Sequence, residues 1–172
     1  PELRYPKRLN CVAELLDKMV AGGHAARPVI RTLIDGKACS CTYRQLLHRV
    51  NQIAQVLTED LKLKPGNRVL LRAPNNPMMA ACLLAVIKAG LVAVPTMPLL
   101  RATELKQIIA KARIGAALCD LRLKDELELA RTGGRDLKQV LYFNDGGPGS
   151  LEQKLAAKSA VFANADTAAD DA

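Results

Sequence analysis

The chain has 172 residues with a formal net charge of +8; hydrophobic residues make up 49% of it, charged residues 24% and aromatic residues only 3%. This length and composition are typical of one globular domain or of a piece of a larger protein. Because basic and acidic residues are interspersed and aromatic stacking platforms are scarce, we expect no nucleic-acid partner. The positive charge then indicates a solvated basic surface, or a basic mouth for an anionic small molecule.

The sequence offers no membrane span and no secretory signal. Its longest apolar run, Met78 to Ile87, is well short of the roughly 20 residues that cross a bilayer. The N-terminal charges are followed neither by an apolar segment nor by a cleavage site. The five cysteines lack the spacing of a disulfide framework. We therefore expect a cytoplasmic protein with reduced thiols.

The N-terminal region is predicted to form a helix and then a hairpin. Asn10 is a suitable N-cap, and Gly22-Gly23 ends a segment in which apolar residues are spaced to form one stripe: Val12, Leu15, Leu16 and Met19. The following stretch, RPVIRTLIDGKACSCTY, is rich in strand-forming residues on both sides of Asp35-Gly36. This dipeptide favours a two-residue turn, so the stretch predicts a small β-hairpin.

Next come a helix, a strand and a second helix. Thr42 and Gln45 have the spacing of a capping box ahead of a long apolar period. Pro65-Gly66 turns the chain into the strand NRVLLRA. Asn76 then caps another helix, with Pro77 at its first position, and Gly90 closes it.

After Gly90 the chain alternates strands with helices. LVAVP, GAALCD and LKQVLYF are strand-like, and helices are expected over about Thr103 to Arg113 and Leu123 to Arg131. With NRVLLRA, this rhythm predicts an α/β fold, a mostly parallel sheet with helices on both faces, alongside the N-terminal hairpin. Residues 1–145 form the predicted α/β subdomain; residues 146–172 are predicted to be a loop, a short helix and a solvated acidic linker.

The loop of APNNPMMAACLLAVIKAG has the position of a nucleotide loop, between a strand and a helix N-terminus. It lacks the glycines that let a backbone approach a phosphate closely. We therefore interpret Asn75 and Asn76 as satisfying backbone groups in a tight turn. The following helix is apolar on nearly every face and is predicted to be a core helix, so Leu84→Asp should unfold the domain.

Other motifs for catalysis or metal binding are weak. Cys39, Cys41 and His48 lack the second ligand pair of a structural zinc site, so the two cysteines are expected to be buried or half-buried. His24 and His48 have no nucleophilic serine in a suitable turn. We predict no catalytic residue and no metal ligand in this chain. Arg101, which follows an irregular Pro-rich segment near a helix start, is the one candidate contact for an anion.

Five motifs occur in an ordered series across residues 41–109: Thr42-Tyr43 with Leu46, Lys64 to Val69, Pro74-Asn75, Lys88 to Gly90, and Pro95 to Leu99. The series resembles the N-terminal part of the adenylate-forming acyl- and aryl-CoA ligases, the AMP-binding superfamily. The segment LNCVAELLDKMVAGGHAARPVIR resembles the opening of the benzoate and 2-aminobenzoate CoA ligases.

The resemblance implies that a carboxylic acid, expected to be aromatic, reacts with ATP to give an acyl-adenylate, which CoA then converts to a thioester with Mg²⁺ as cofactor. The family's phosphate loop, adenine motif and catalytic lysine match no part of this chain. Residues 1–172 alone are thus expected to be inactive, to bind no cofactor tightly, and to expose an apolar surface that favours homodimers. Some relatives place an arginine for the CoA phosphates at the position of Leu99, so Arg101 is the predicted substitute. The alternative is a free-standing binding module on the same scaffold.

Overall fold

A parallel four-stranded sheet forms the centre of the molecule in the computed structural model, which describes residues 5–34 and 36–171. The strand order is β4-β3-β5-β6. The strands are β3 (Arg68–Arg72), β4 (Val92–Thr96), β5 (Ala116–Asp120) and β6 (Gln139–Phe143). All neighbouring strands in this sheet are parallel, as the alternation of strands and helices predicts.

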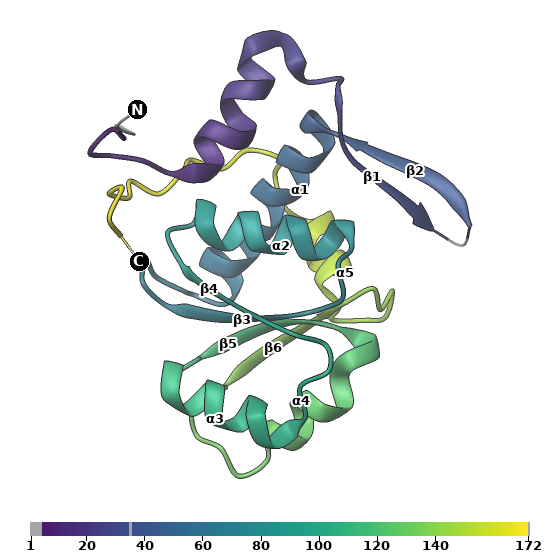
Figure 1. The fold of residues 1–172 in the computed structure, drawn as a ribbon, viewed down its shortest axis with the longest axis vertical. Coiled ribbons are helices and arrows are strands. Elements are labelled where there is room, and N and C mark those ends of the chain that lie inside the picture. Colours follow the sequence, from purple (N-terminus) through teal and green to yellow (C-terminus); the bar gives the residue numbers. More distant parts are fainter. Residues whose placement is uncertain (1–4, 35, 172) are drawn as a thin grey trace.

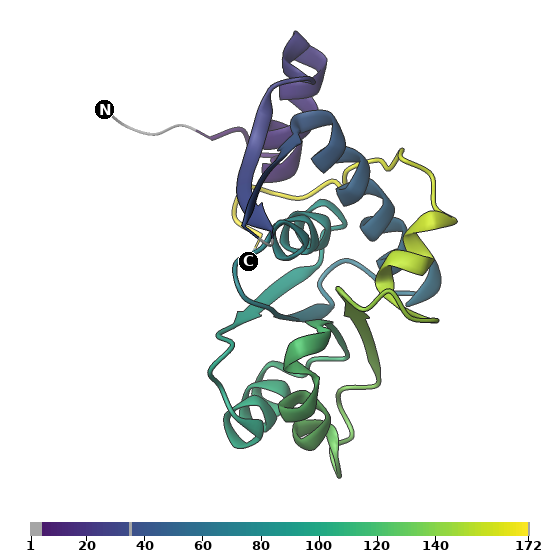
Figure 2. The same ribbon diagram turned by 90° about the vertical axis from the view of Figure 1, so that its right-hand side faces the viewer.

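Helices cover both faces of the sheet (Figures 1 and 2). One face carries α1 (Tyr43–Gln55), α2 (Pro77–Lys88) and α5 (Leu151–Ala156), and the other carries α3 (Ala102–Ala112) and α4 (Lys124–Arg131). Successive side chains of β3 point to opposite faces of the sheet and belong to two separate cores. Val69 and Leu71 pack with the first group of helices, and Leu70 packs with the second. The predicted α/β fold is confirmed.

The predicted hairpin is also present. It consists of β1 (Pro28–Ile34) and β2 (Lys37–Thr42), which pair antiparallel. Asp35 lies outside the described residues, and Gly36 has a φ of 75°, as the turn requires. The hairpin projects from the body of the molecule (Figure 1). Cys39 is therefore exposed, contrary to our prediction, whereas Cys41 at the base of the hairpin is half-buried.

The N-terminal helix covers residues 11–24 and contains two π-helical stretches, η1 (Ala13–Asp17) and η2 (Val20–His24). Val12 and Leu16 are buried as predicted, but Leu15 is 57% exposed. The wider winding of a π turn rotates successive side chains by a different angle from an α-helix, so the α-helical spacing placed Leu15 wrongly.

The two central helices begin as predicted. Thr42 and Gln45 form the capping box of α1, and the Asn76 side chain accepts a hydrogen bond from the Met79 N–H at 2.8 Å at the start of α2. The helix α1 continues into the π-helical η3 (Val56–Asp60).

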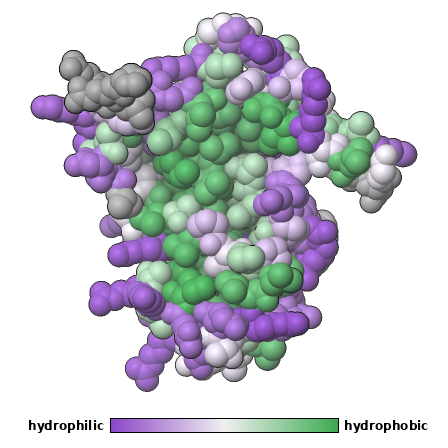
Figure 3. Space-filling view, viewed as in Figure 1, coloured by the Kyte–Doolittle hydropathy of each residue, from purple (hydrophilic) through white to green (hydrophobic). Residues whose placement is uncertain are grey.

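The helix α2 belongs to the main core, as predicted, but it is not fully buried on every side. Its fully buried residues are Ala81, Cys82, Ala85, Val86 and Lys88. Leu84 is only half-buried, together with Met78, Met79, Leu83 and Ile87. Only one side of α2 faces the sheet and α1, and an apolar surface lies over this part of the molecule in the same view (Figure 3). Leu84→Asp therefore no longer tests the burial of the helix.

The C-terminal segment packs against the rest of the chain. We expected a solvated linker, but residues 157–171 run back along α1 toward the N-terminal segment (Figure 1). The Asn51 side chain donates to the Ala160 carbonyl at 2.8 Å, and Gln55 donates to the carbonyls of Ser159 and Val161. The spacing of apolar residues, on which the prediction relied, does not indicate a segment that is held by hydrogen bonds from polar side chains. The division of the chain at residue 145 stays a prediction.

Candidate functional site

The carboxyl ends of β3 and β5 form the topological switch point of the sheet. From β3 the chain crosses through α2 on one face to β4, whereas from β5 it passes through η4 (Leu121–Leu123) and α4 on the opposite face to β6. In open α/β sheets the crevice between two such strands is the usual ligand position. Two polar clusters occupy this edge, one around Asp120 and one around Arg72.

Asp120, the last residue of β5, is fully buried and accepts hydrogen bonds from three side chains. Its carboxylate receives Arg122 Nε at 2.9 Å and Nη2 at 2.8 Å, Asn144 Nδ2 at 2.7 Å and Asn76 Nδ2 at 3.2 Å. The hydrogen bonds from Arg122 hold the pKa of Asp120 below its ordinary value, with Asn144 adding to the effect. The cluster thus joins the loops that follow β3, β5 and β6.

The Asn76 contacts agree with the structural interpretation of its loop. Its Oδ1 caps α2, and its Nδ2 donates to Asp120. Both polar atoms of the amide are therefore engaged within the protein, and the loop works as a packed bend between strand and helix.

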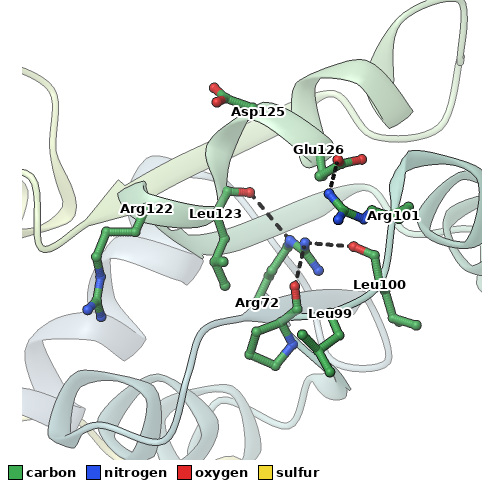
Figure 4. A pocket seen from close by; sticks show the side chains of 9 residues that line it. Arg72, Leu99, Leu100, Arg101, Arg122, Leu123, Asp125 and Glu126 are labelled. Atoms are coloured by element: carbon green, nitrogen blue, oxygen red, sulfur yellow. Dashed lines mark hydrogen bonds and ion pairs between the residues drawn. The ribbon is translucent and has the colours of Figure 1, made fainter.

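Arg72, the last residue of β3, is only 1% exposed. Its guanidinium donates to the carbonyl oxygens of Pro98 at 3.1 Å, Leu100 at 2.8 Å and Leu123 at 3.4 Å (Figure 4). It also donates to the Met97 carbonyl at 3.0 Å. Burial lowers the pKa of this arginine from its ordinary value. The buried cation therefore connects the end of β3 with the loop after β4.

Arg101 is the N-cap residue of α3, and its side chain is 76% exposed. Its Nη1 lies 2.9 Å from Glu126 Oε1 (Figure 4). The other carboxylate oxygen, Glu126 Oε2, accepts the Ala102 N–H at 2.8 Å. These hydrogen bonds, that of Arg101 first, lower the pKa of Glu126. Glu126 thereby fixes both the side chain of Arg101 and the first turn of α3.

A cavity of about 290 Å³ opens beside Arg72 and Arg101. Three guanidinium groups and two carboxylates line it, from Arg72, Arg101, Arg122, Asp125 and Glu126. The uncharged part of the wall consists of Pro98 to Leu100 and Leu123. Leu99, in the wall, is 81% exposed. Arg101 pairs with Glu126 and Arg122 pairs with the buried Asp120, so most of the positive charge is compensated within the protein.

The other candidates from the sequence lie away from this edge. Cys41 is half-buried in the hairpin, where burial raises the pKa of its thiol, and His24 and His48 are exposed. Within residues 5–34 and 36–171, no three or more His, Cys, Asp or Glu side chains gather closely enough to hold a metal ion. None of the helices in this part of the chain is long and apolar enough to span a membrane.

Sequence reasoning missed most of the site. Asp120 is the last residue of an apolar strand and Asn144 directly follows one, and polar residues at the carboxyl ends of parallel strands are a signal that could have been found. Arg72 also ends a parallel strand, but its burial could not be predicted, because an arginine at such a position is usually solvated.

A family model described as "AMP-binding enzyme" matches residues 20–171. An uncharacterized acyl–CoA ligase of Bacillus subtilis, YtcI, is 28% identical over 99% of this chain, which spans 31% of that protein. A benzoate–CoA ligase of Thauera aromatica is 26% identical over 99% of the chain, which spans 32% of that protein. The chain therefore spans about a third of the curated relatives that it matches.

Solved structures agree on the fold. An anthranilate CoA ligase, AuaEII, in complex with anthranoyl-AMP superimposes with a TM-score of 0.84 at 18% identity, over 97% of this chain and 31% of that one. ATP-bound MatB from Rhodopseudomonas palustris gives a TM-score of 0.74 at 27% identity, over 94% of this chain and 30% of that one. With the family model matching nearly the whole sequence, the chain belongs to the AMP-binding enzyme family, whose members include acyl- and aryl-CoA ligases.

Proposed function

We propose that this chain is the N-terminal part of an acid–CoA ligase that activates a carboxylic acid, preferentially an aromatic one, with ATP and transfers the acyl group to CoA. The supporting observation is the family match over residues 20–171, together with a benzoate–CoA ligase that aligns with 99% of the chain. As the chain spans only 32% of that relative, the residues that bind ATP and the acid are proposed to lie in the remainder of the ligase.

The proposed reaction has two steps. A carboxylate oxygen of the acid attacks the α-phosphorus of ATP, and the bond to pyrophosphate breaks, so that an acyl-adenylate forms. The CoA thiolate then attacks the acyl carbon, and AMP leaves. Mg²⁺ compensates phosphate charge in such a reaction. No three or more His, Cys, Asp or Glu side chains of the described residues gather to hold a metal ion, and the ligands of Mg²⁺ are proposed to lie in the remainder of the ligase.

Arg101 is the proposed contact of this chain with CoA. Its guanidinium has five N–H donors, of which the group at Nη1 is engaged with Glu126, and the side chain is 76% exposed beside the cavity that three arginines line. The first N–H groups of α3 already donate to Glu104 and Glu126, so a phosphate approaching from solvent would meet the free donors of Arg101 itself. The residue thus fits a nucleotide phosphate of CoA.

The isolated chain is proposed to be inactive and to self-associate. The outward side of α2 carries half-buried apolar residues, such as Met79 and Leu83, that the rest of a ligase would cover. Homodimers of the isolated chain would bury the same surface. A cytoplasmic location remains part of the proposal, supported by five free cysteines.

The proposal is tested by incubating the intact ligase with ATP, CoA and single carboxylic acids, and measuring acyl-CoA by mass spectrometry. We expect thioester formation with benzoate or 2-aminobenzoate to exceed that with acetate. Thioester formation only with acetate would contradict the aromatic preference, and AMP release without any acid-dependent product would contradict the ligase.

A further inference from the structure

The loop between β4 and α3, residues 97–101, is largely exposed. Met97 is 64% exposed and Leu99 is 81% exposed, so two of its large apolar side chains contribute little burial. The loop also contains Pro98, which has no backbone N–H to donate. Its conformation must therefore rest on other contacts.

Leu100 packs against the second core and donates its N–H to the Met97 carbonyl, and Arg72 supplies the hydrogen bonds from outside the loop to its carbonyl groups. Strand pairing ends at Arg72 and Thr96, after which the carbonyl groups of the loop no longer meet β3. The Arg72 guanidinium replaces the sheet ladder, donating to the carbonyls of Met97, Pro98 and Leu100 at 2.8 to 3.1 Å. Hydrogen bonds from a charged donor are stronger than those between neutral groups, and burial strengthens them further.

The same guanidinium reaches the next crossover. Its Nε lies 3.4 Å from the Leu123 carbonyl, three residues before Glu126, which holds Arg101. One buried side chain therefore touches both of the segments that determine the position of the exposed arginine.

We propose that Arg72 is a positioning residue that fixes the 97–101 loop so that Leu99 and Arg101 are presented to CoA in a single arrangement. The inference rests on the proposed function of Arg101. Arg72 itself faces loop carbonyls from the buried side, and the exposed residues of the loop meet the ligand. Binding then avoids the cost of ordering a mobile loop.

The hold on the loop is tested by amide hydrogen exchange on the 172-residue chain. Arg72→Met keeps an apolar stem but removes every donor, and should raise exchange at Leu99 to Ala102 on the order of tenfold. Arg68→Met, an exposed arginine at the start of the same strand, is the matched control and should leave exchange unchanged. Unchanged exchange in the loop of the Arg72 variant would overturn the inference.

The functional half is tested in the intact ligase. Arg72→Met should raise the KM for CoA about 10- to 100-fold, because small misplacements of a binding group are costly, while ATP–pyrophosphate exchange stays near the wild-type rate. Arg72→Lys retains charge and donors, and should restore part of the CoA affinity. A general loss of folding would instead lower thioester formation and pyrophosphate exchange together, and such equal losses would overturn the positioning role. An unchanged KM for CoA in a variant whose loop exchanges faster would also overturn it.

Folding is checked by circular dichroism. If Arg72→Met does not fold, the lysine variant decides: a raised KM for CoA with normal pyrophosphate exchange supports the inference, and wild-type kinetics overturn it. Wild-type ligase without acid-dependent pyrophosphate exchange would defeat the proposed function and the CoA role together. The hydrogen-exchange comparison would still establish whether Arg72 holds the loop.

Discussion

The ammonium group of Lys88 lies 2.8 Å from both carboxylate oxygens of Asp17, and the lysine side chain is completely buried. Lys88 ends α2, and Asp17 belongs to the N-terminal helix. The carbonyl of Lys88 also accepts the Ala165 N–H at 2.9 Å. One residue thus joins the N-terminal helix, α2 and the C-terminal segment, which are far apart in sequence.

Asp17→Asn should destabilise the chain by about 3 kcal/mol, because it leaves a buried ammonium without its counter-ion. Urea unfolding followed by circular dichroism measures the change. Glu14→Gln is the control, since its pair with Lys18 on the same helix is exposed and should contribute less than about 0.5 kcal/mol. Equal effects of the two substitutions would show that the burial of Lys88 does not matter.

Asp120 should give the fold a characteristic dependence on pH. Its hydrogen bonds lower the folded-state pKa below the ordinary value of 3.8, so the carboxylate stabilises the fold at pH above 3.8, and this contribution is lost as pH falls through the folded pKa. Asp120→Asn should cost roughly 2–4 kcal/mol at neutral pH, since an amide cannot accept all of these donors.

The check is Tm measured from neutral pH to about pH 3, where an ordinary Asp is largely protonated. The difference in Tm between the wild-type chain and the Asp120→Asn variant should become smaller as the pH falls. A difference that stays constant over the whole range would contradict an ionised, hydrogen-bonded Asp120.

The two sides of α2 should respond differently to a buried charge. Ala85 is fully buried, so Ala85→Asp places a carboxylate in the core, which costs several kcal/mol and should unfold the chain. Leu84 is half-buried, so Leu84→Asp should leave a folded chain with a reduced Tm. Far-UV circular dichroism of the two variants measures this, and unfolding by both would mean that Leu84 is as buried as Ala85.

Arg101→Gln should raise the KM of the intact ligase for CoA while acid-dependent pyrophosphate exchange continues. Loss of one charge-assisted contact to a phosphate corresponds to about a tenfold change or more. The matched control is Lys106→Gln, an exposed cation further along α3. Steady-state kinetics with CoA as the varied substrate decide: an unchanged KM would end the proposed role of Arg101.

Local sequence signals predicted the fold where chemistry acts over a few residues. The capping box of Thr42 and Gln45 and the Asn76 cap appear as expected, and the strands follow their apolar runs. Long-range contacts were invisible. Nothing near Arg72 in sequence reveals that it meets carbonyls some 25 residues later, and the docking of Gln55 onto Val161 joins residues 106 positions apart. The prediction that Leu15 is buried was wrong because it assumed the spacing of an α-helix.

The candidate site was predictable only in part. Position after a strand identified the Asn76 loop, and the resemblance to CoA ligases drew attention to Arg101 and Leu99. The partners Glu126 and Asp120 emerge only when the sheet brings separate strand ends to one edge.

The central claim, that this chain is part of an adenylate-forming ligase whose chemistry lies outside residues 1–172, is tested most directly by ATP–pyrophosphate exchange. The assay compares the 172-residue chain with the intact ligase, each with benzoate, with 2-aminobenzoate and without acid. We predict acid-dependent exchange by the intact ligase and none by the chain alone. Exchange catalysed by the chain, or its absence from the intact ligase with every carboxylic acid tried, would contradict the account.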